Sequence, residues 1–315
     1  MSDKTREYFN SVGEAREFLE GKKQLQKDLN VTKISNKIWY EDAKLRVQQD
    51  GHDTHDEFQL SPTAWNQLML KCQIPIQYAQ RIPQDLLEKN VNRMLPNKDL
   101  MLRTEEDRIR GIVTPRYKPI DHLELLSGLE KFIQVSGHSL TKLFVTDDYM
   151  RWNILTGKER GREIGQAVQL GWDGINGETG MHPIARALFV LKLVCTNGMV
   201  RRDATFAFTT RHIKNKEDVL KDYWEINDTA ADAMMDCIKQ ASVEALTASL
   251  TQDVREFVKT YIKGENDLNT FMRERRDNAR QVITRMDLVD NITDYAKQHP
   301  EAVRREIESY AGSII

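Results

Sequence analysis

Between residues 98 and 213 short apolar runs alternate with turn residues, and this pattern constrains the fold more than any other feature of the chain. A β-hairpin is predicted by DLMLR and RIRGIVTPRY, which flank the polar turn TEED. A second hairpin is predicted by KLFVTDD and YMRWNILTG, and three more strands by QAVQLGWDGI, ARALFVLKLVC and ATFAFTTRH. The run from Ala187 to Cys195 suits a strand covered on both faces, although a short buried helix fits it too. We therefore expect a mixed, mostly antiparallel sheet.

Helical patterns flank this sheet in the sequence. Pro62, Pro75 and Pro83 each begin a helix, and KIWYEDAKLRVQ at 37 to 48 alternates as a strand before them. After Lys214 the apolar spacing is helical throughout. We expect an α+β fold with helices on one side of the sheet, a small helical N-terminal part and a long helical C-terminal extension. The corresponding parts are residues 1–97, 98–216 and 217–315.

The C-terminal extension carries a broad apolar stripe. Its members keep the spacing of one helix face: Val254, Phe257, Val258, Tyr261 and Ile262. Such a stripe either packs on the sheet or joins chains together. We expect a homo-oligomer that forms through residues 217–315.

The composition bears on where the protein is located in the cell and on whether its cysteines form disulfides or bind zinc. No segment approaches the roughly 20 apolar residues that span a bilayer, and the first residues lack an apolar signal core. We therefore expect a cytoplasmic protein without a membrane partner. Its cysteines, Cys72, Cys195 and Cys237, are odd in number and widely spaced, so we expect neither a disulfide framework nor a zinc finger.

Basic residues gather in the middle of the chain. Residues 151 to 216 contain 11 basic and 5 acidic residues, so this window carries a net charge of +6. The whole chain carries −2, which leaves −8 for the rest. A local excess of positive charge is typical of a surface that meets an anionic partner. Ordinary strand faces with solvated charges have the same composition.

Two segments of the sheet region imitate chemical sites. Cys195 precedes Arg201-Arg202, which favours a reactive thiol, but a cysteine after Leu-Val is more typical of a buried apolar side chain. Asn197-Gly198 predicts a tight hairpin turn beside it. GWDGINGETG at 171 to 180 lacks the spacing of a phosphate-binding loop. We interpret its glycines as turn residues that display Asn176 and Glu178.

The segment at 51 to 57 holds several side chains that ligate metals, namely His52, Asp53, His55, Asp56 and Glu57. Metal sites draw their ligands from separated elements and need supporting partners, so we interpret this segment as a polar loop. No standard hydrolase motif occurs. We expect no catalytic residue, no metal and no cofactor.

Basic and aromatic residues at strand ends and in connecting loops form the most coherent set. Phosphates need Lys or Arg, and unstacked bases need a flat aromatic surface. The candidate nucleic-acid-binding residues are Arg116, Tyr117, Lys118, Trp152, Lys158, Arg160, Arg162, Arg201, Arg202, Arg211 and Lys214. Tyr117 and Trp152 are the candidate stacking surfaces. The alternative is that the aromatic rings belong to the core and the charges are solvated.

Three blocks of the sequence carry a resemblance. The first contains Arg110, Thr114, Arg116 and Tyr117. The second contains Asn176, Glu178 and Gly180, and the third contains Cys195, Asn197 and Gly198. Over residues 55 to 215 the chain resembles the phage- and plasmid-borne "domain of unknown function 932" family, with Gly177 in place of the usual serine. The resemblance implies a bacterial host and a setting among replication and recombination genes.

Charge, motifs and resemblance favour single-stranded DNA binding without catalysis, with strand annealing in phage or plasmid recombination as the activity. Annealing needs a basic groove that holds one strand and no catalytic group. One alternative is a metal-dependent enzyme acting on nucleic acid or nucleotides, built around Asn176, Glu178 and nearby histidines. Another alternative is a host-directed protein-interaction module that uses the helical extension.

Overall fold

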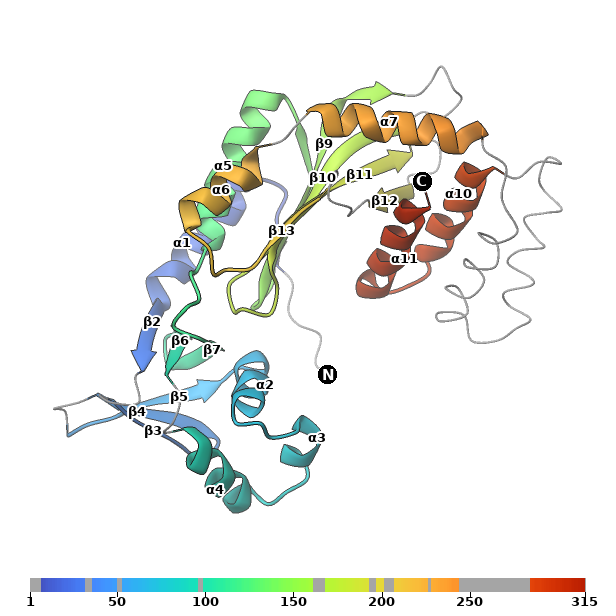
Figure 1. Ribbon diagram of the computed structural model, residues 1–315. Helices are drawn as coiled ribbons and strands as arrows, with labels where there is room; N and C mark the ends of the chain where they lie inside the picture. Colours follow the sequence, from blue (N-terminus) through green and yellow to red (C-terminus); the bar gives the residue numbers. More distant parts are fainter. Residues whose placement is uncertain are drawn as a thin grey trace. The chain divides into compact units, whose positions relative to one another are not determined.

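The computed structural model describes residues 7–31, 36–49, 53–95, 99–160, 168–192, 197–200, 207–225, 228–243 and 284–314. Two compact units are present, and each is built from three separate segments. The first unit comprises Met1–Ile154, Gly174–Arg186 and Thr209–Glu225. The second comprises Leu155–Asp173, Ala187–Phe208 and Ile226–Ile315. The described part of each unit contains both helices and antiparallel strands, which confirms the α+β class (Figure 1).

Within the described residues, one sheet of the first unit has six strands in the order β2-β6-β7-β5-β4-β3. These strands are β2 (Gln26–Val31), β3 (Asn36–Glu41), β4 (Lys44–Gln49), β5 (Asp56–Leu60), β6 (Leu100–Glu105) and β7 (Arg108–Val113). Strands β6 and β7 form the expected antiparallel hairpin. β5 and β7 pair in parallel, and the other neighbours are antiparallel, so this sheet is mixed. The single sheet expected over residues 98 to 213 is wrong in this respect, because only the β6–β7 hairpin belongs to this sheet and the later strands form a second one.

The single strand expected at 37 to 48 is wrong, because this segment is a hairpin of β3 and β4. The turn is made by Asp42 and Ala43, which both have positive φ, at 51° and 60°. Two consecutive residues in this region match a tight turn whose twist suits antiparallel strands. The polar loop expected up to residue 57 ends earlier, because β5 begins at Asp56.

Three helices pack on this sheet, namely α2 (Pro62–Lys71), α3 (Ile76–Ala79) and α4 (Gln84–Met94). The expected starts after Ser61, Pro75 and Pro83 are confirmed, and the Ser61 hydroxyl accepts a hydrogen bond from the backbone N–H of Ala64 at 3.0 Å. Apolar side chains of the helices and the strands share one core, which includes Leu68, Met69, Val91, Leu102 and Ile109. Burial of such side chains is the main stabilising contribution.

A second sheet has seven strands among the described residues, in the order β1-β8-β9-β10-β11-β12, with β13 also pairing β11. The strands are β1 (Glu7–Tyr8), β8 (Ser139–Val145), β9 (Tyr149–Arg160), β10 (Val168–Gly177), β11 (Ile184–Lys192), β12 (Asn197–Val200) and β13 (Ala207–Thr210). The apolar run at 187 is therefore a strand, and four consecutive residues from Ala187 to Val190 are buried. Burial of adjacent residues means that both faces of β11 are covered.

The turn expected at Asn197-Gly198 is misplaced. These two residues already belong to β12, where Asn197 lies opposite Lys192 and Gly198 opposite Leu191. The same register places Met199 opposite Val190 and Val200 opposite Phe189 along the two strands. The chain does reverse direction here as expected, but it does so before Asn197. Cys195 lies outside the described residues.

Helices α1 (Val12–Leu25), α5 (His122–Ser136) and α6 (Lys216–Trp224) belong to the first unit, and α5 packs against both α1 and α6 (Figure 1). The start of α5 is capped, because Asp121 and Glu124 form a reciprocal capping box. The side chain of Asn215 caps α6 by accepting from the N–H of Glu217 at 2.8 Å. The caps fix where the loops before α5 and α6 end.

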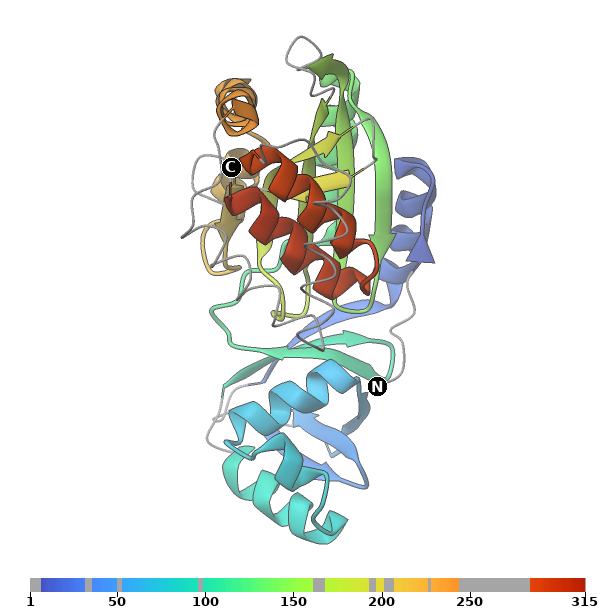
Figure 2. The ribbon, with the colours of Figure 1, turned by 90° about the vertical axis from the view of Figure 1, so that its right-hand side faces the viewer.

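The described part of the C-terminal region contains α7 (Asp228–Val243), α10 (Arg285–Ala296) and α11 (Glu301–Ser313). Figure 2 shows α10 and α11 side by side, and the helical extension is confirmed to this extent. The stripe from Val254 to Ile262 lies outside the described residues. In the part of the chain that the structure covers, no helix has the length and apolar character needed to cross a membrane.

Candidate nucleic-acid interface

Two loops of the first unit carry four of the candidate cations. One loop follows β7 and contains Arg116 and Lys118, and the other follows β13 and contains Arg211 and Lys214. The backbone N–H of Lys118 donates to the carbonyl oxygen of His212 at 2.7 Å, so the loops lie directly against each other. All four cations are exposed. We call Arg116, Lys118, Arg211 and Lys214 the basic patch.

Beneath the basic patch the two loops are joined by their aromatic side chains. The rings of Tyr117 and His212 stack with centroids 5.1 Å apart and planes 30° apart. Both side chains are buried, and the hydroxyl of Tyr117 donates to the carbonyl oxygen of Gly177 at 3.0 Å. Each loop therefore has a buried ring beside its exposed cations, and the contact between the two rings joins the loops.

The charges of the basic patch are not neutralised by carboxylates of the described residues. Across the residues that the structure describes, none of its four cations forms an ion pair with a carboxylate. Other cations of this unit do form them, as in the pair of Arg108 with Asp147 at 3.2 Å. Unpaired and exposed cations keep their charge accessible to a polyanion.

A buried group of polar side chains, the Glu178 cluster, lies next to Tyr117. It consists of Arg103, Arg110, His122, Asn176 and Glu178, which come from β6, β7, the start of α5, β10 and the residue after β10. One carboxylate oxygen of Glu178 accepts from Nη1 of Arg110 at 2.9 Å, and the other accepts from the backbone N–H of His122 at 2.6 Å. The carbonyl oxygen of Glu178 accepts from Nη1 of Arg103 at 2.6 Å.

The remaining groups of the Glu178 cluster extend these contacts. Arg103 also donates to Asp28 at 3.0 Å and to Asp121 at 2.9 Å. Nδ2 of Asn176 lies 2.9 Å from the carbonyl oxygen of Ile120 and 3.0 Å from Nδ1 of His122. The cluster therefore fastens β10 to β6, β7 and the loop that carries Lys118.

The charges of the cluster follow from its burial. Burial lowers the pKa of His122 to about 4, so this ring is neutral at pH 7. Burial by itself would raise the pKa of Glu178, but the charges of His122, Arg110 and Arg103 outweigh it and hold that pKa far below its usual range. Since His122 is charged only in acid, the two arginines stabilise the carboxylate at neutral pH. Burial also lowers the pKa of His212, to about 4.

Two blocks that carry the resemblance meet in this cluster. Arg110 and Tyr117 belong to the first block, Asn176 and Glu178 belong to the second, and hydrogen bonds join them at Arg110–Glu178 and at Tyr117–Gly177. Their common role in this structure is to hold the fold together. The third block lies partly outside the described residues.

Residue 177, where the resembled family has serine, has no room for a side chain. A Cβ on Gly177 would lie 2.6 Å from the carbonyl oxygen and 2.7 Å from Cβ of His182. We expect Gly177→Ser to lower the free energy of unfolding by about 1–3 kcal/mol because of this overpacking. Chemical denaturation measures it. The matched control is Gly21→Ser, where a Cβ meets nothing within 4 Å; an equal loss in both variants would refute the steric explanation.

The expected stacking role of the aromatic residues needs correction. Trp152 is fully buried, and its ring stacks on Trp224 at 5.7 Å with an interplanar angle of 18°. Tyr117 is 8% exposed and covered by His212. Neither ring presents a face to solvent, because both strands and loops use them to fill the core. The alternative interpretation, core aromatics with solvated charges, describes these two residues.

The other candidate cations do not belong to the basic patch. Lys158 and Arg160 end β9 and belong to the second unit. Arg162, Arg201 and Arg202 lie outside the described residues. Arg186, counted in the basic window, is buried and donates from Nη2 to the carbonyl oxygen of Glu225 at 2.8 Å at the end of α6.

Sequence reasoning missed His212, Arg103 and Trp224. Arg103 follows the apolar run LML, and alternation along the strand places it on the face of Met101, opposite Leu100 and Leu102, so no local signal marks it as buried. His212 and Trp224 follow no pattern of their own. Their positions depend on contacts with Tyr117 and Trp152, which are distant in the sequence.

The residues proposed for the alternative enzyme function, Asn176 and Glu178, belong to the Glu178 cluster. Asn176, Glu178 and His122 do come together, but the Glu178 carboxylate is 3% exposed and both its oxygens already accept hydrogen bonds. Among the described side chains, no three of His, Cys, Asp or Glu lie close enough together to hold a metal ion. In the segment with several potential metal ligands, Glu57 of β5 pairs with Lys44 at 2.9 Å and with Arg46 at 3.0 Å.

Comparisons with other proteins add no relative. The chain matches no family model, no curated protein and no solved structure.

Proposed function

We propose that the protein binds single-stranded nucleic acid through the basic patch, with strand annealing as the activity this serves. The observation that carries the proposal is the presence of four exposed cations without ion-pair partners, on two loops joined by the Lys118–His212 hydrogen bond. Phosphate contacts supply most of the affinity in sequence-independent binding. The underlying Glu178 cluster keeps the loops fixed, so the cations need little reorganisation to bind.

A single strand suits the basic patch better than a duplex. Duplex readers place a helix or a two-stranded ribbon in the major groove, whereas this patch lies on two loops. Loops with adjacent cations are able to follow one line of phosphates. The patch contains no group that reads a base edge in a fixed geometry, so we expect binding with little sequence preference.

The proposal predicts a salt-dependent affinity that depends on the basic patch. Binding of a labelled single-stranded oligonucleotide, followed by fluorescence anisotropy, should weaken with a log–log slope of about 0.7 per neutralised phosphate. The double variant Lys118→Ala with Arg211→Ala should flatten that slope by about 1.4. Both side chains are exposed, so the fold should be retained.

Lys89→Ala is the matched control, because Lys89 is exposed on α4 in the same unit and lies outside the patch. Its slope should equal that of the unaltered protein. Failure to bind at about 50 mM salt would refute the proposal, and so would an equal loss of slope in the control. Parallel series with duplex DNA and single-stranded RNA determine which nucleic acid is preferred.

A further inference from the structure

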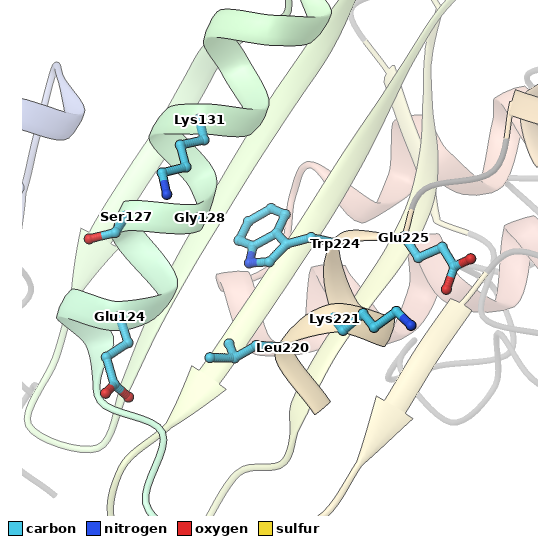
Figure 3. A pocket seen from close by; sticks show the side chains of 8 residues that line it. All are labelled: Glu124, Ser127, Gly128, Lys131, Leu220, Lys221, Trp224 and Glu225. Atoms are coloured by element: carbon cyan, nitrogen blue, oxygen red, sulfur yellow. The ribbon is translucent and has the colours of Figure 1, made fainter. Parts of the chain in front are cut away.

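An open groove runs between helices α5 and α6, away from the Glu178 cluster. Its volume is about 680 Å³, which is within the usual range for a small-molecule site. Figure 3 shows the side chains that line it: Glu124, Ser127, Gly128 and Lys131 from α5, and Leu220, Lys221, Trp224 and Glu225 from α6 and its C-terminal end. The floor is formed largely by the apolar side chains of Leu220 and Trp224.

The indole of Trp224 is fixed in the groove. It stacks on Trp152, and the ring of Tyr223 meets it edge to face at 4.9 Å and 89°. Its Nε1 edge lies against Gly128, where a Cβ would be 2.2 Å from Nε1. Glycine at 128 therefore admits the ring between the helices. Unlike Trp152, Trp224 is partly exposed, and it lines the groove (Figure 3).

The groove begins where the basic patch ends. The patch loops lead directly into α5 and α6, and Lys216 pairs with Glu124 across the first turns of the two helices. From Lys216 to Lys221 within α6, a helical rise of about 1.5 Å per residue gives about 7.5 Å. That distance corresponds to about two stacked nucleotides.

The charges around the groove are also those of a nucleotide site. Lys131 and Lys221 are exposed, and neither forms an ion pair with any residue the structure describes. Glu124 is neutralised by Lys216, which leaves Glu225 as the opposing charge at one end. Lysines beside an aromatic surface supply phosphate contacts and stacking together.

We propose that the groove between α5 and α6 receives an unpaired base of the strand whose phosphates lie on the basic patch. The base stacks against Trp224, and Lys131 and Lys221 contact the adjoining phosphates. This inference rests on the proposed function and adds to it a subsite for bases.

The test compares two probes on the full, unaltered chain. One is a single-stranded thymidine oligonucleotide, and the other is the same backbone with abasic residues throughout. The thymidine probe should bind about tenfold more tightly at about 50 mM salt, and it alone should quench tryptophan fluorescence. The salt slopes of the two probes should be equal, because both carry the same phosphates.

Variants locate the effect. Leu220→Trp fills the groove with an apolar side chain and should remove the preference for thymidine while leaving the abasic affinity unchanged. Lys221→Glu should weaken both probes, whereas Lys89→Glu, a charge reversal on α4, should change neither. Denaturation curves verify that each variant is folded.

The outcomes separate this inference from the proposed function. Equal affinity of the unaltered chain for the two probes, with a normal salt slope, overturns the base subsite, leaves the basic patch standing and assigns the groove another occupant such as a peptide. Absence of binding to both probes overturns the subsite and the proposed function together. A folded Leu220→Trp protein that still prefers thymidine also overturns the subsite.

Discussion

Glu178→Gln lowers the free energy of unfolding by about 3–5 kcal/mol, because it leaves buried arginine charge without its carboxylate. In either orientation the amide turns its NH2 group toward a donor, either Nη1 of Arg110 or the backbone N–H of His122, where a carboxylate oxygen now accepts. The Arg110 side chain is 7% exposed, so water does not replace the lost acceptor. Denaturation by urea, monitored by circular dichroism, measures the loss.

An exposed ion pair serves as the control for this prediction, and a double-mutant cycle tests the coupling between Arg110 and Glu178. The control is Glu130→Gln, which breaks the ion pair between Glu130 and Arg16. The Glu130 side chain is 41% exposed, so this change should lower the free energy of unfolding by about 1 kcal/mol or less. Arg110→Met combined with Glu178→Gln should cost less than the sum of the two single changes, because both members of the pair are then neutral. Additive losses, or a loss in Glu178→Gln no larger than in Glu130→Gln, would show that the pair is not coupled.

Acidification from pH 6.5 to pH 4 destabilises the fold through His122 and His212. Burial lowers the pKa of each from 6.5 to about 4. Above pH 6.5 both the folded and the unfolded chain carry neutral rings, so the stability is fully present. Below that value the unfolded chain binds protons that the folded chain does not, and stability is lost as the pH falls through the folded pKa. Each ring contributes about 3 kcal/mol to this loss.

The pH dependence is measured from unfolding curves at closely spaced pH values. Near pH 5 the free energy of unfolding should fall by about 2.7 kcal/mol per pH unit from the two rings together. His212→Gln should roughly halve that slope, and His55→Gln, which alters an exposed side chain, should leave it unchanged. A profile that is flat between pH 6.5 and pH 4.5 would contradict the neutral, buried state of both rings.

Local patterns in the sequence predicted the parts of the fold that local interactions determine. The hairpin of β6 and β7 was specified by two apolar segments that flank a polar turn, and the strand β11 by a continuous apolar run. The turn at Asp42-Ala43 was missed because neither residue is glycine, although both adopt positive φ.

Long-range contacts explain what remained hidden. Arg110 and Glu178 are 68 positions apart, so no periodicity relates them. Alternation along β9 marks Trp152 as one face of a strand but does not say which face is covered, and its burial depends on Gly174, where a Cβ would lie 2.1 Å from the indole. The cations of the basic patch were predicted, because charged side chains in loops are usually exposed. The stacking role of Tyr117 and Trp152 was not, because aromatic rings are often buried.

The interleaving of the two compact units has a consequence for how this chain is dissected. Strands β9, β10 and β11 each begin in one unit and end in the other. No single cut in the polypeptide therefore releases either unit whole, and a truncated chain that keeps all of the first unit also keeps segments 155–173 and 187–208 of the second. An end-to-end fusion of a further domain therefore finds no boundary between the two units.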